Sequence, residues 1–78
     1  MDKNIIVLGL GRFGMSVATK LFEEGFYVTA VDSNYELIEK MANKVSSAIQ
    51  ADITEEIAMH SLGINNYDVA IIATGSDL

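Results

Sequence analysis

The sequence predicts an α/β fold in which a parallel sheet is built from alternating strands and helices. Runs rich in β-branched and apolar residues alternate with segments of helical length and pattern. The first run, residues 4–8, lacks the alternation of a half-exposed strand and is typical of a parallel strand buried on both faces. A glycine-rich turn follows it directly. Right-handed crossovers then give the chain order β-α-β-α-β-α-β and the strand order 3-2-1-4, a partial doubly wound sheet.

The first helix should run from about residue 12 to residue 24. Gly25 supplies the residue in the left-handed region that commonly ends a helix. The apolar residues of this segment recur at helical spacing and should lie on or near its buried face; they are Phe13, Val17, Leu21 and Phe22.

The second strand is expected over residues 27–31, with Asp32 at its carboxyl end. Ser33 and Glu36 have the spacing of a capping box, which predicts a second helix with Ser33 as its N-cap. The apolar positions that follow continue this helix to about Lys44.

The third strand should be short, around residues 47–50, and a third helix should begin near Thr54 and end before Gly63. Residues 69–73 form a clear fourth strand. The chain has no proline and only short turns, so it contains no candidate domain boundary. We therefore expect residues 1–78 to form a single, truncated Rossmann-type nucleotide-binding domain.

Composition limits the classes of function open to the chain. Five basic and eleven acidic residues give a net charge of −6, which argues against binding to nucleic acid or to anionic membranes. The chain lacks cysteine, which excludes disulfides and thiolate chemistry and fits a reducing cytoplasm. No apolar run approaches the ~18 residues of a membrane helix, and the first residues do not form a signal peptide.

Residues 9–14, GLGRFG, have the GxGxxG spacing of a dinucleotide-binding turn, and they stand between a predicted strand and a predicted helix. Gly9 allows a tight turn, Gly11 lets a pyrophosphate approach the backbone, and Gly14 lets the helix pack closely on the strand. The amides at the start of the helix attract phosphate. The alternative is a tight turn that binds no ligand.

Two acidic residues follow strands at the same end of the predicted sheet. Asp32, 18 residues after Gly14, is placed to accept hydrogen bonds from both hydroxyls of an adenine ribose. It favours NAD(H) over NADP(H), because it would repel a 2′-phosphate, and Ser33 and Asn34 could soften that preference. Asp52, followed by Ile53, is placed to accept a hydrogen bond from the adenine amine. For each aspartate the alternative is capping of the helix that follows, and for Asp32 the two roles can coexist.

Arg12 lies inside the glycine turn, where backbone amides suffice for a dinucleotide. An arginine there adds charge-assisted contacts to phosphate, which suits ADP or ATP as well as NAD(H). The alternative is a solvent-exposed arginine. Thr74 and Gly75 end the fourth strand beside the first, where ligands bind in such sheets, although Gly75 could serve the turn alone.

No catalytic set is visible in the sequence. It offers no general base for hydride transfer and no nucleophile paired with a base. The single histidine, His60, has no second imidazole with which to form a metal site. We expect a binding protein rather than an enzyme. The alternative is the dinucleotide-binding fragment of an NAD-dependent oxidoreductase.

Three stretches of the chain resemble one family: residues 5–34, which contain GLGRFG, residues 50–56, QADITEE, and residues 62–77, LGINNYDVAIIATGSD. The family is that of RCK domains, also called KTN or TrkA-N domains, which regulate potassium channels and potassium uptake systems from the cytoplasm. The resemblance extends over essentially the whole chain and is to the N-terminal, nucleotide-binding half of these domains.

The resemblance implies a domain that binds NAD(H), ATP or ADP and that gates potassium flux through a membrane partner when the ligand is exchanged. It also implies dimers, often assembled into a ring at the inner face of the membrane. The family's phosphate turn, ribose acid, adenine contact and fourth-strand turn fall on Gly9, Gly11, Arg12, Phe13 and Gly14, on Asp32, on Asp52, and on Thr74 and Gly75.

The chain departs from the family in length, because the family's domain continues through two more strands and a helix. The fourth strand should then form an exposed apolar edge. Such an edge favours pairing with a second copy or domain swapping, so we expect a dimer or a higher oligomer.

Overall fold

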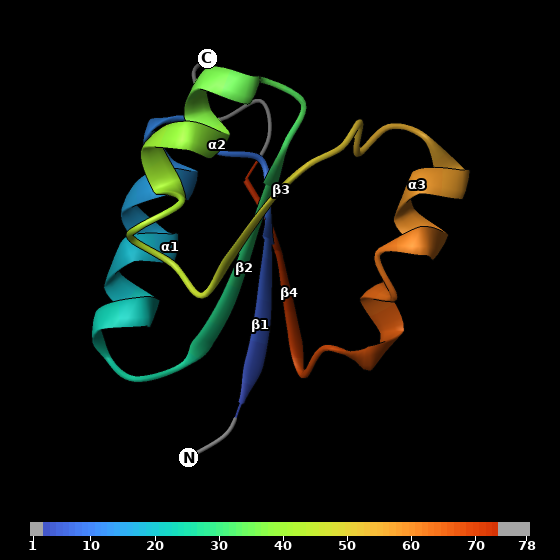
Figure 1. Cartoon of the computed structure of the whole chain (residues 1–78). Coiled ribbons are helices and arrows are strands. Elements are labelled where there is room, and N and C mark those ends of the chain that lie inside the picture. The colour runs from blue at the N-terminus through green and yellow to red at the C-terminus, as the bar shows by residue number, and fades with distance from the viewer. Residues whose placement is uncertain (1–2, 74–78) are drawn as a thin grey trace.

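A computed structural model describes residues 3–73 of the chain (Figure 1). Its strands form one parallel sheet in the order β3-β2-β1-β4. In chain order the elements are β1 Asn4–Leu8, α1 Arg12–Glu23, β2 Tyr27–Asp32, α2 Tyr35–Met41, β3 Ser47–Gln50, α3 Glu56–Ser61, the short 3-10 helix η1 Ile64–Asn66, and β4 Val69–Ile72. The predicted fold class, order of elements and strand order are confirmed, and η1 is an element that the sequence pattern did not predict.

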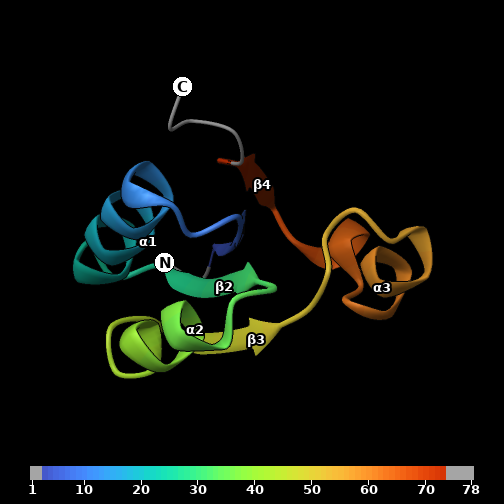
Figure 2. The same ribbon diagram turned by 90° about the horizontal axis from the view of Figure 1, so that it is seen from above.

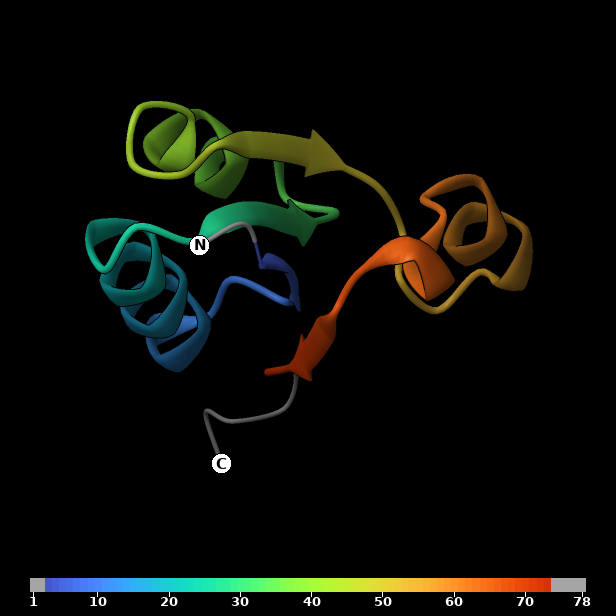
Figure 3. The same ribbon diagram turned by 90° about the horizontal axis from the view of Figure 1, so that it is seen from below.

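Helices cover both faces of the sheet. Figures 1 and 2 show α1 and α2 on one face and α3 with η1 on the other. Figure 3 shows β3 and β4 at opposite edges, with β1 and β2 between them. This arrangement follows from crossovers of one hand, which place successive helices on one face until the chain reverses direction across the sheet.

Side chains of β1 alternate between two buried clusters because successive residues of a strand point to opposite faces. Ile5 and Val7 pack on the α1–α2 side, in a cluster that also contains Leu10, Ala18, Val28, Ala30, Ile38, Met41 and Val45. Ile6 and Leu8 pack with Val31 on the α3 side, where the surrounding apolar residues are only partly buried. The main core therefore lies beneath α1 and α2.

The two flanks of the sheet differ in burial. β1 is buried from Ile5 to Leu8, as its continuous apolar sequence predicts. β4 pairs with β1 alone among the described strands, and the side chains of Val69 and Ile72 are 38% and 71% exposed. The exposed apolar edge expected for the fourth strand is thus present in the described residues.

The expected start of the second helix is wrong by one residue. The N-cap is Asn34, whose side-chain oxygen accepts a hydrogen bond from the Glu36 amide at 2.9 Å, and Ser33 lies outside the helix. The physical reason is that Asp32 Oδ1 accepts the Asn34 amide at 2.8 Å and closes a turn over Ser33. Asparagine is as good an N-cap as serine, so propensity did not decide between them.

The expected end of the second helix is also wrong. α2 ends at Met41 rather than near Lys44, and its last turn tightens into hydrogen bonds from Ala42 to Glu39 and from Lys44 to Met41. The tighter turn brings Val45 into the main core, where it is 5% exposed. At the third helix, residues 53–54 form a turn, so α3 begins at Glu56, two residues after Thr54.

The buried face of α1 is narrower than its apolar pattern predicts. Gly14 and Ala18 are the buried residues of this helix, and Val17 and Leu21 are half-buried. Phe13 and Phe22 are 56% and 39% exposed, which contradicts their placement on the buried face. Close packing of the small residues against the sheet leaves no room beneath the helix for large rings at its margins. Gly25 ends the helix at φ 101°, as expected.

Candidate functional site

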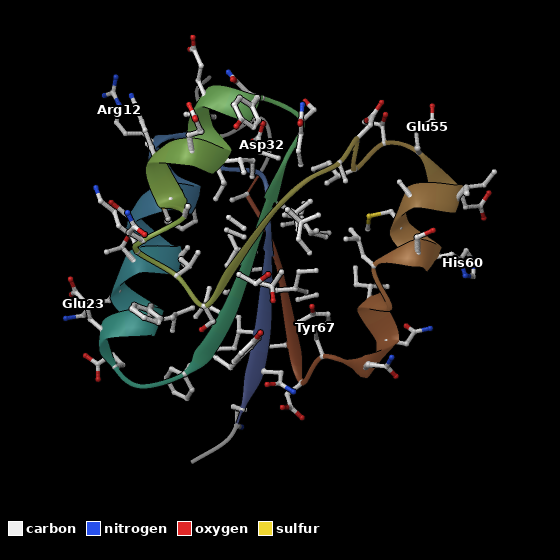
Figure 4. All side chains as sticks on the ribbon, in the orientation of Figure 1. Arg12, Glu23, Asp32, Glu55, His60 and Tyr67 are labelled. Atoms are coloured by element: carbon white, nitrogen blue, oxygen red, sulfur yellow. The ribbon has the colours of Figure 1, made fainter. Side chains whose placement is uncertain are left out.

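The carboxyl ends of the strands and the amino ends of the helices lie at one end of the molecule. Figure 4 shows Arg12, Asp32 and Glu55 at this end, on or beside α1, β2 and α3. Ligands of parallel α/β sheets bind beyond the carboxyl ends of the strands, where the strand order reverses. Here the order reverses between β1 and β4, next to the turn that leads into α1.

The glycine turn is fixed by its contacts to neighbouring strands. Gly9 adopts φ 102°, a conformation that a side chain disfavours, and its amide donates to Val31 O at 2.8 Å. A Cβ atom on Gly14 would lie 2.0 Å from Gly9 O and 3.2 Å from the Cβ of Ala73. Position 14 therefore requires glycine for the helix to reach the turn, which is the role that the sequence pattern assigns to it.

The amino end of α1 is suited to an anion. Gly11 is the N-cap, with extended backbone and no side chain to cover the amides, and the first turn contains no acidic residue. The first intrahelical bond runs from Met15 N to Gly11 O at 2.9 Å, so the preceding amides have no partner within the helix. Arg12 and Phe13, the first two helical residues, are both exposed. The helix end thus presents amide donors and a guanidinium to solvent.

Asp32 is half-buried at the end of β2 and makes two hydrogen bonds. Its Oδ2 accepts from the Leu10 amide at 2.7 Å, and its Oδ1 accepts from the Asn34 amide at 2.8 Å. The second contact forms the turn into α2, which is close to the capping role that the sequence left open. The first contact reaches the glycine turn, 22 residues earlier in the chain.

Asp52 is exposed and its contacts are local. Its Oδ1 accepts from the Thr54 hydroxyl at 2.6 Å and from the Thr54 amide at 2.9 Å. The hydroxyl contact, followed by the amide contact, lowers the pKa of the Asp52 carboxyl below its ordinary value. Ile53 is half-buried and packs against the cluster of Ile6, Leu8 and Val31. The backbone N–H of Ala51 donates to Asp32 O at 3.0 Å, which ties the end of β3 to the end of β2.

The other predicted site residues are Ser33, Thr74 and Gly75. Ser33 is exposed, and its carbonyl accepts from the Gln50 side chain at 3.1 Å. Thr74 and Gly75 lie outside the described residues. The residue before them, Ala73, is buried and its amide donates to Leu8 O at 2.8 Å.

None of the predicted site residues lies in α3. His60 is exposed and points away from the sheet (Figure 4). Within residues 3–73, no three histidine, aspartate or glutamate side chains are grouped so that they could hold a metal ion. No helix in this part of the chain is long and apolar enough to cross a membrane.

Leu10 is the residue that sequence reasoning missed at this site, and the role of Asn34 as N-cap was missed with it. Leu10 stands between two glycines in a turn, yet its side chain is fully buried in the main core. A large apolar residue inside a glycine turn was the available signal, since turns of this kind usually run over the surface. Asn34 follows Asp32 by two residues, the spacing of a side chain that closes its own turn.

A parallel sheet of this strand order, with a glycine turn after the first strand and an acidic residue after the second, defines a Rossmann-type α/β domain. The family model for the TrkA-N domain matches residues 5–78. The chain therefore belongs to the TrkA-N domain family.

Several curated relatives of the chain are named as proteins of potassium uptake systems. The chain is 42% identical over 77 residues to the Ktr system potassium uptake protein A of Vibrio alginolyticus, covering 99% of this chain and 35% of the relative. It is 38% identical over 78 residues to the Ktr system potassium uptake protein C of Bacillus subtilis, covering 100% of this chain and 35% of the relative. Identity to the Trk system potassium uptake protein TrkA of Mycobacterium tuberculosis is 29% over 73 residues, covering 94% and 33%. The chain spans about a third of the length of these relatives.

Proposed function

We propose that this chain is a nucleotide-binding regulatory domain that controls a potassium channel or a potassium uptake transporter. The proposal rests on the hydrogen bond that connects the glycine turn to the Asp32 carboxylate. The amino end of α1, whose amides no side chain caps, lies beside them. Helix amides attract phosphate, and a carboxylate at the end of the second strand suits ribose hydroxyls. The names of the relatives support potassium uptake as the process.

In this proposal each part of a nucleotide has its own residues. The phosphates bind the backbone of Gly9, Gly11 and Gly14 with the side chain of Arg12, and Phe13 flanks them. The ribose hydroxyls bind Asp32, beside Ser33. The adenine lies near Asp52 and the backbone of Ile53. Thr74 and Gly75, outside the described residues, remain contacts predicted from the sequence pattern. Asp52 has a second oxygen that makes none of the Thr54 contacts, so it can accept from the adenine amine while Thr54 stays bound.

The ligand is NAD(H) or an adenosine phosphate, ATP or ADP. The exposed guanidinium of Arg12 at the first helical position supports ligands with terminal phosphate charge. Asp32 disfavours NADP(H), because its carboxylate would repel the 2′-phosphate.

Regulation requires that the ligand bind one conformation more tightly than another, since equal affinity for both shifts nothing. A membrane potassium channel or transporter subunit would read that change, with this domain peripheral to the inner face of the membrane. The role is regulatory rather than catalytic. The relatives are named as potassium uptake proteins, which supports this choice.

Titration calorimetry of the chain with NADH, NAD⁺, NADPH, ATP and ADP tests the proposal. We expect NAD(H) and at least one adenosine phosphate to bind, and NADPH to bind more weakly than NADH. Arg12→Ala should weaken the binding of ATP and ADP more than that of NADH. Asp32→Ala should weaken the binding of every ribose-bearing ligand. Lys20→Ala, which removes an exposed cation further along the same helix, is the matched control for charge.

The outcomes separate the alternatives. Binding of NAD(H) alone, indifferent to Arg12→Ala, would favour the dinucleotide-binding fragment of an oxidoreductase. Binding of none of these ligands would refute the nucleotide site.

Self-association is the second part of the proposal. We propose that the edge of β4 pairs with a second copy, giving a dimer or a unit of a larger ring. The exposed side chains of Val69 and Ile72 on opposite faces of this edge support it, because flat apolar edges promote pairing. Light scattering at rising concentration should show a dimer or larger species, and Ile72→Lys should reduce it. A monomer at every concentration contradicts this part alone.

A further inference from the structure

One carboxylate joins two turns that come from different parts of the chain. Asp32 Oδ2 accepts the Leu10 amide of the glycine turn at 2.7 Å, and Oδ1 accepts the Asn34 amide at the start of α2 at 2.8 Å. Hydrogen bonds to an ionised carboxylate are stronger than those between neutral groups. The end of β2 is therefore attached to the glycine turn by a side chain.

The glycine turn is held at three points around Leu10. The Gly9 amide donates to Val31 O at 2.8 Å, the Leu10 amide donates to Asp32, and the Leu10 side chain is buried in the main core. Gly11, the next residue, is the N-cap of α1. The peptide groups at Leu10 therefore come directly before the first amides of α1.

We propose that Asp32 is a positioning residue for the glycine turn, so that ribose recognition and the geometry of the phosphate-binding amides depend on the same carboxylate. This inference rests on the proposed function for its ligand. A carboxylate has two oxygens and about four acceptor sites, of which the described contacts use one on each oxygen. A ribose diol can bind the remaining sites while Leu10 and Asn34 stay in place.

The change in pyrophosphate affinity on removing the Asp32 carboxylate distinguishes this proposal from a role in ribose binding alone, because the two roles predict different signs for that change. Inorganic pyrophosphate has no ribose. If Asp32 contacts only ribose, removing its negative charge leaves pyrophosphate affinity unchanged or raises it, since one repulsive charge is lost. If Asp32 positions the glycine turn, the same substitution lowers pyrophosphate affinity although it removes a repulsion.

The experiment is titration of pyrophosphate and of ADP into the wild-type chain, Asp32→Ala and Asp32→Asn. For pyrophosphate, which has no adenine, Asp52→Ala is the matched control, because it removes a nearby carboxylate whose side-chain contacts are local. We expect Asp32→Ala to weaken pyrophosphate roughly tenfold, the scale of one charge-assisted hydrogen bond. Asp32→Asn retains one acceptor for the Leu10 amide and should recover pyrophosphate binding while ADP binding stays weak. Unchanged or tighter pyrophosphate binding by Asp32→Ala overturns the proposal.

A second readout needs no ligand. Hydrogen exchange of the Leu10 amide, followed by NMR relative to the amides of β1, should accelerate in Asp32→Ala and stay slow in the Asp52→Ala control. A Leu10 amide that keeps its slow exchange in Asp32→Ala overturns the positioning role. If the wild-type chain binds neither pyrophosphate nor nucleotide, the proposed function fails, and the exchange rates still decide whether Asp32 holds the turn.

Discussion

Asp32 and Asp52 occupy similar positions in the sequence and make contacts of opposite kinds. Asp32 is the last residue of β2 and Asp52 follows the end of β3, and each precedes a helix at the same end of the sheet. The Asp32 carboxylate accepts from the Leu10 amide, 22 residues away, whereas the Asp52 carboxylate accepts from the amide and the hydroxyl of Thr54, two residues away. Asp32 therefore connects elements, and Asp52 shapes one turn.

The strand order explains the difference. β2 lies beside β1, so the turn that leaves β1 passes over the end of β2 and brings the Leu10 amide within reach. β3 is the edge strand on the other side of β2, and no glycine turn crosses its end. The same residue type becomes a long-range connection or a local cap according to its neighbour in the sheet. This contrast predicts unequal effects of substitution in the two regions.

The largest expected effect is at Gly14, which packs against the glycine turn. Gly14→Ala would place a Cβ atom 2.0 Å from the Gly9 carbonyl oxygen, which is backbone and cannot move without disturbing β1. We expect a loss of about 3 kcal/mol or more in the free energy of unfolding, at the upper end for overpacking. Urea denaturation measures it.

Gly63→Ala is the control on the α3 side of the molecule. Gly63 has φ 66°, and its added Cβ would meet only the end of the Asn66 side chain at 3.1 Å. The expected loss is about 1–2 kcal/mol, the cost of a side chain in the left-handed region. Equal losses for the two variants would mean that the glycine turn tolerates displacement, contrary to the close packing described above.

The next largest effect is at Asp32. Asp32→Ala leaves the Leu10 amide, which is partly buried, without its acceptor, and we expect a loss of about 2 kcal/mol in unfolding free energy. Asp52→Ala should cost less, because water can replace the lost contacts at an exposed turn. Thermal and urea unfolding of both variants at neutral pH measure the difference. A larger loss for Asp52→Ala would reverse the comparison.

Much of this architecture could be predicted from local patterns. The alternation of strands and helices predicted the order of the strands in the sheet. The buried run of β1 and the glycine spacing predicted the turn into α1, because each of these signals lies within a few residues. The same patterns assigned Gly14 to close packing, and the distance to Gly9 agrees. Such features are set by backbone geometry and need no knowledge of distant neighbours.

The features that were missed depend on contacts between elements. The bond from Leu10 to Asp32 requires the adjacency of β1 and β2 at atomic detail, which periodicity does not provide. The N-cap is Asn34 rather than Ser33, because the hydrogen bond from the Asn34 amide to Asp32 places Ser33 in the turn that precedes the helix. Phe13 and Phe22 stayed exposed because small residues of α1 occupy the contact with the sheet. In each case a neighbouring element, rather than local propensity, decided the outcome.

The smallest expected effect is a change in the pKa of the Asp52 carboxyl. The folded-state pKa of its carboxyl lies below the ordinary value, first because of the Thr54 hydroxyl and second because of the Thr54 amide. The ionised form therefore favours the folded state. Its contribution to stability is complete above the ordinary pKa of an aspartate and is lost as the pH falls through the lowered pKa.

Thr54→Val removes the hydroxyl and keeps both the shape of the side chain and the amide contact. We expect the pKa of Asp52 to rise toward its ordinary value without reaching it, since the weaker of the two causes remains. The ¹³C chemical shift of the Asp52 carboxyl, followed by NMR through acid pH, gives both pKa values. Binding of ADP at neutral pH should hardly change, because the carboxyl is ionised there in both proteins and the substitution alters no contact outside the turn. A marked loss of ADP affinity in Thr54→Val would show instead that ADP binding depends on the geometry of the turn at Asp52, as we propose for the turn at Asp32. The distinction between an aspartate that connects elements and one that shapes a single turn would then not apply to ligand binding.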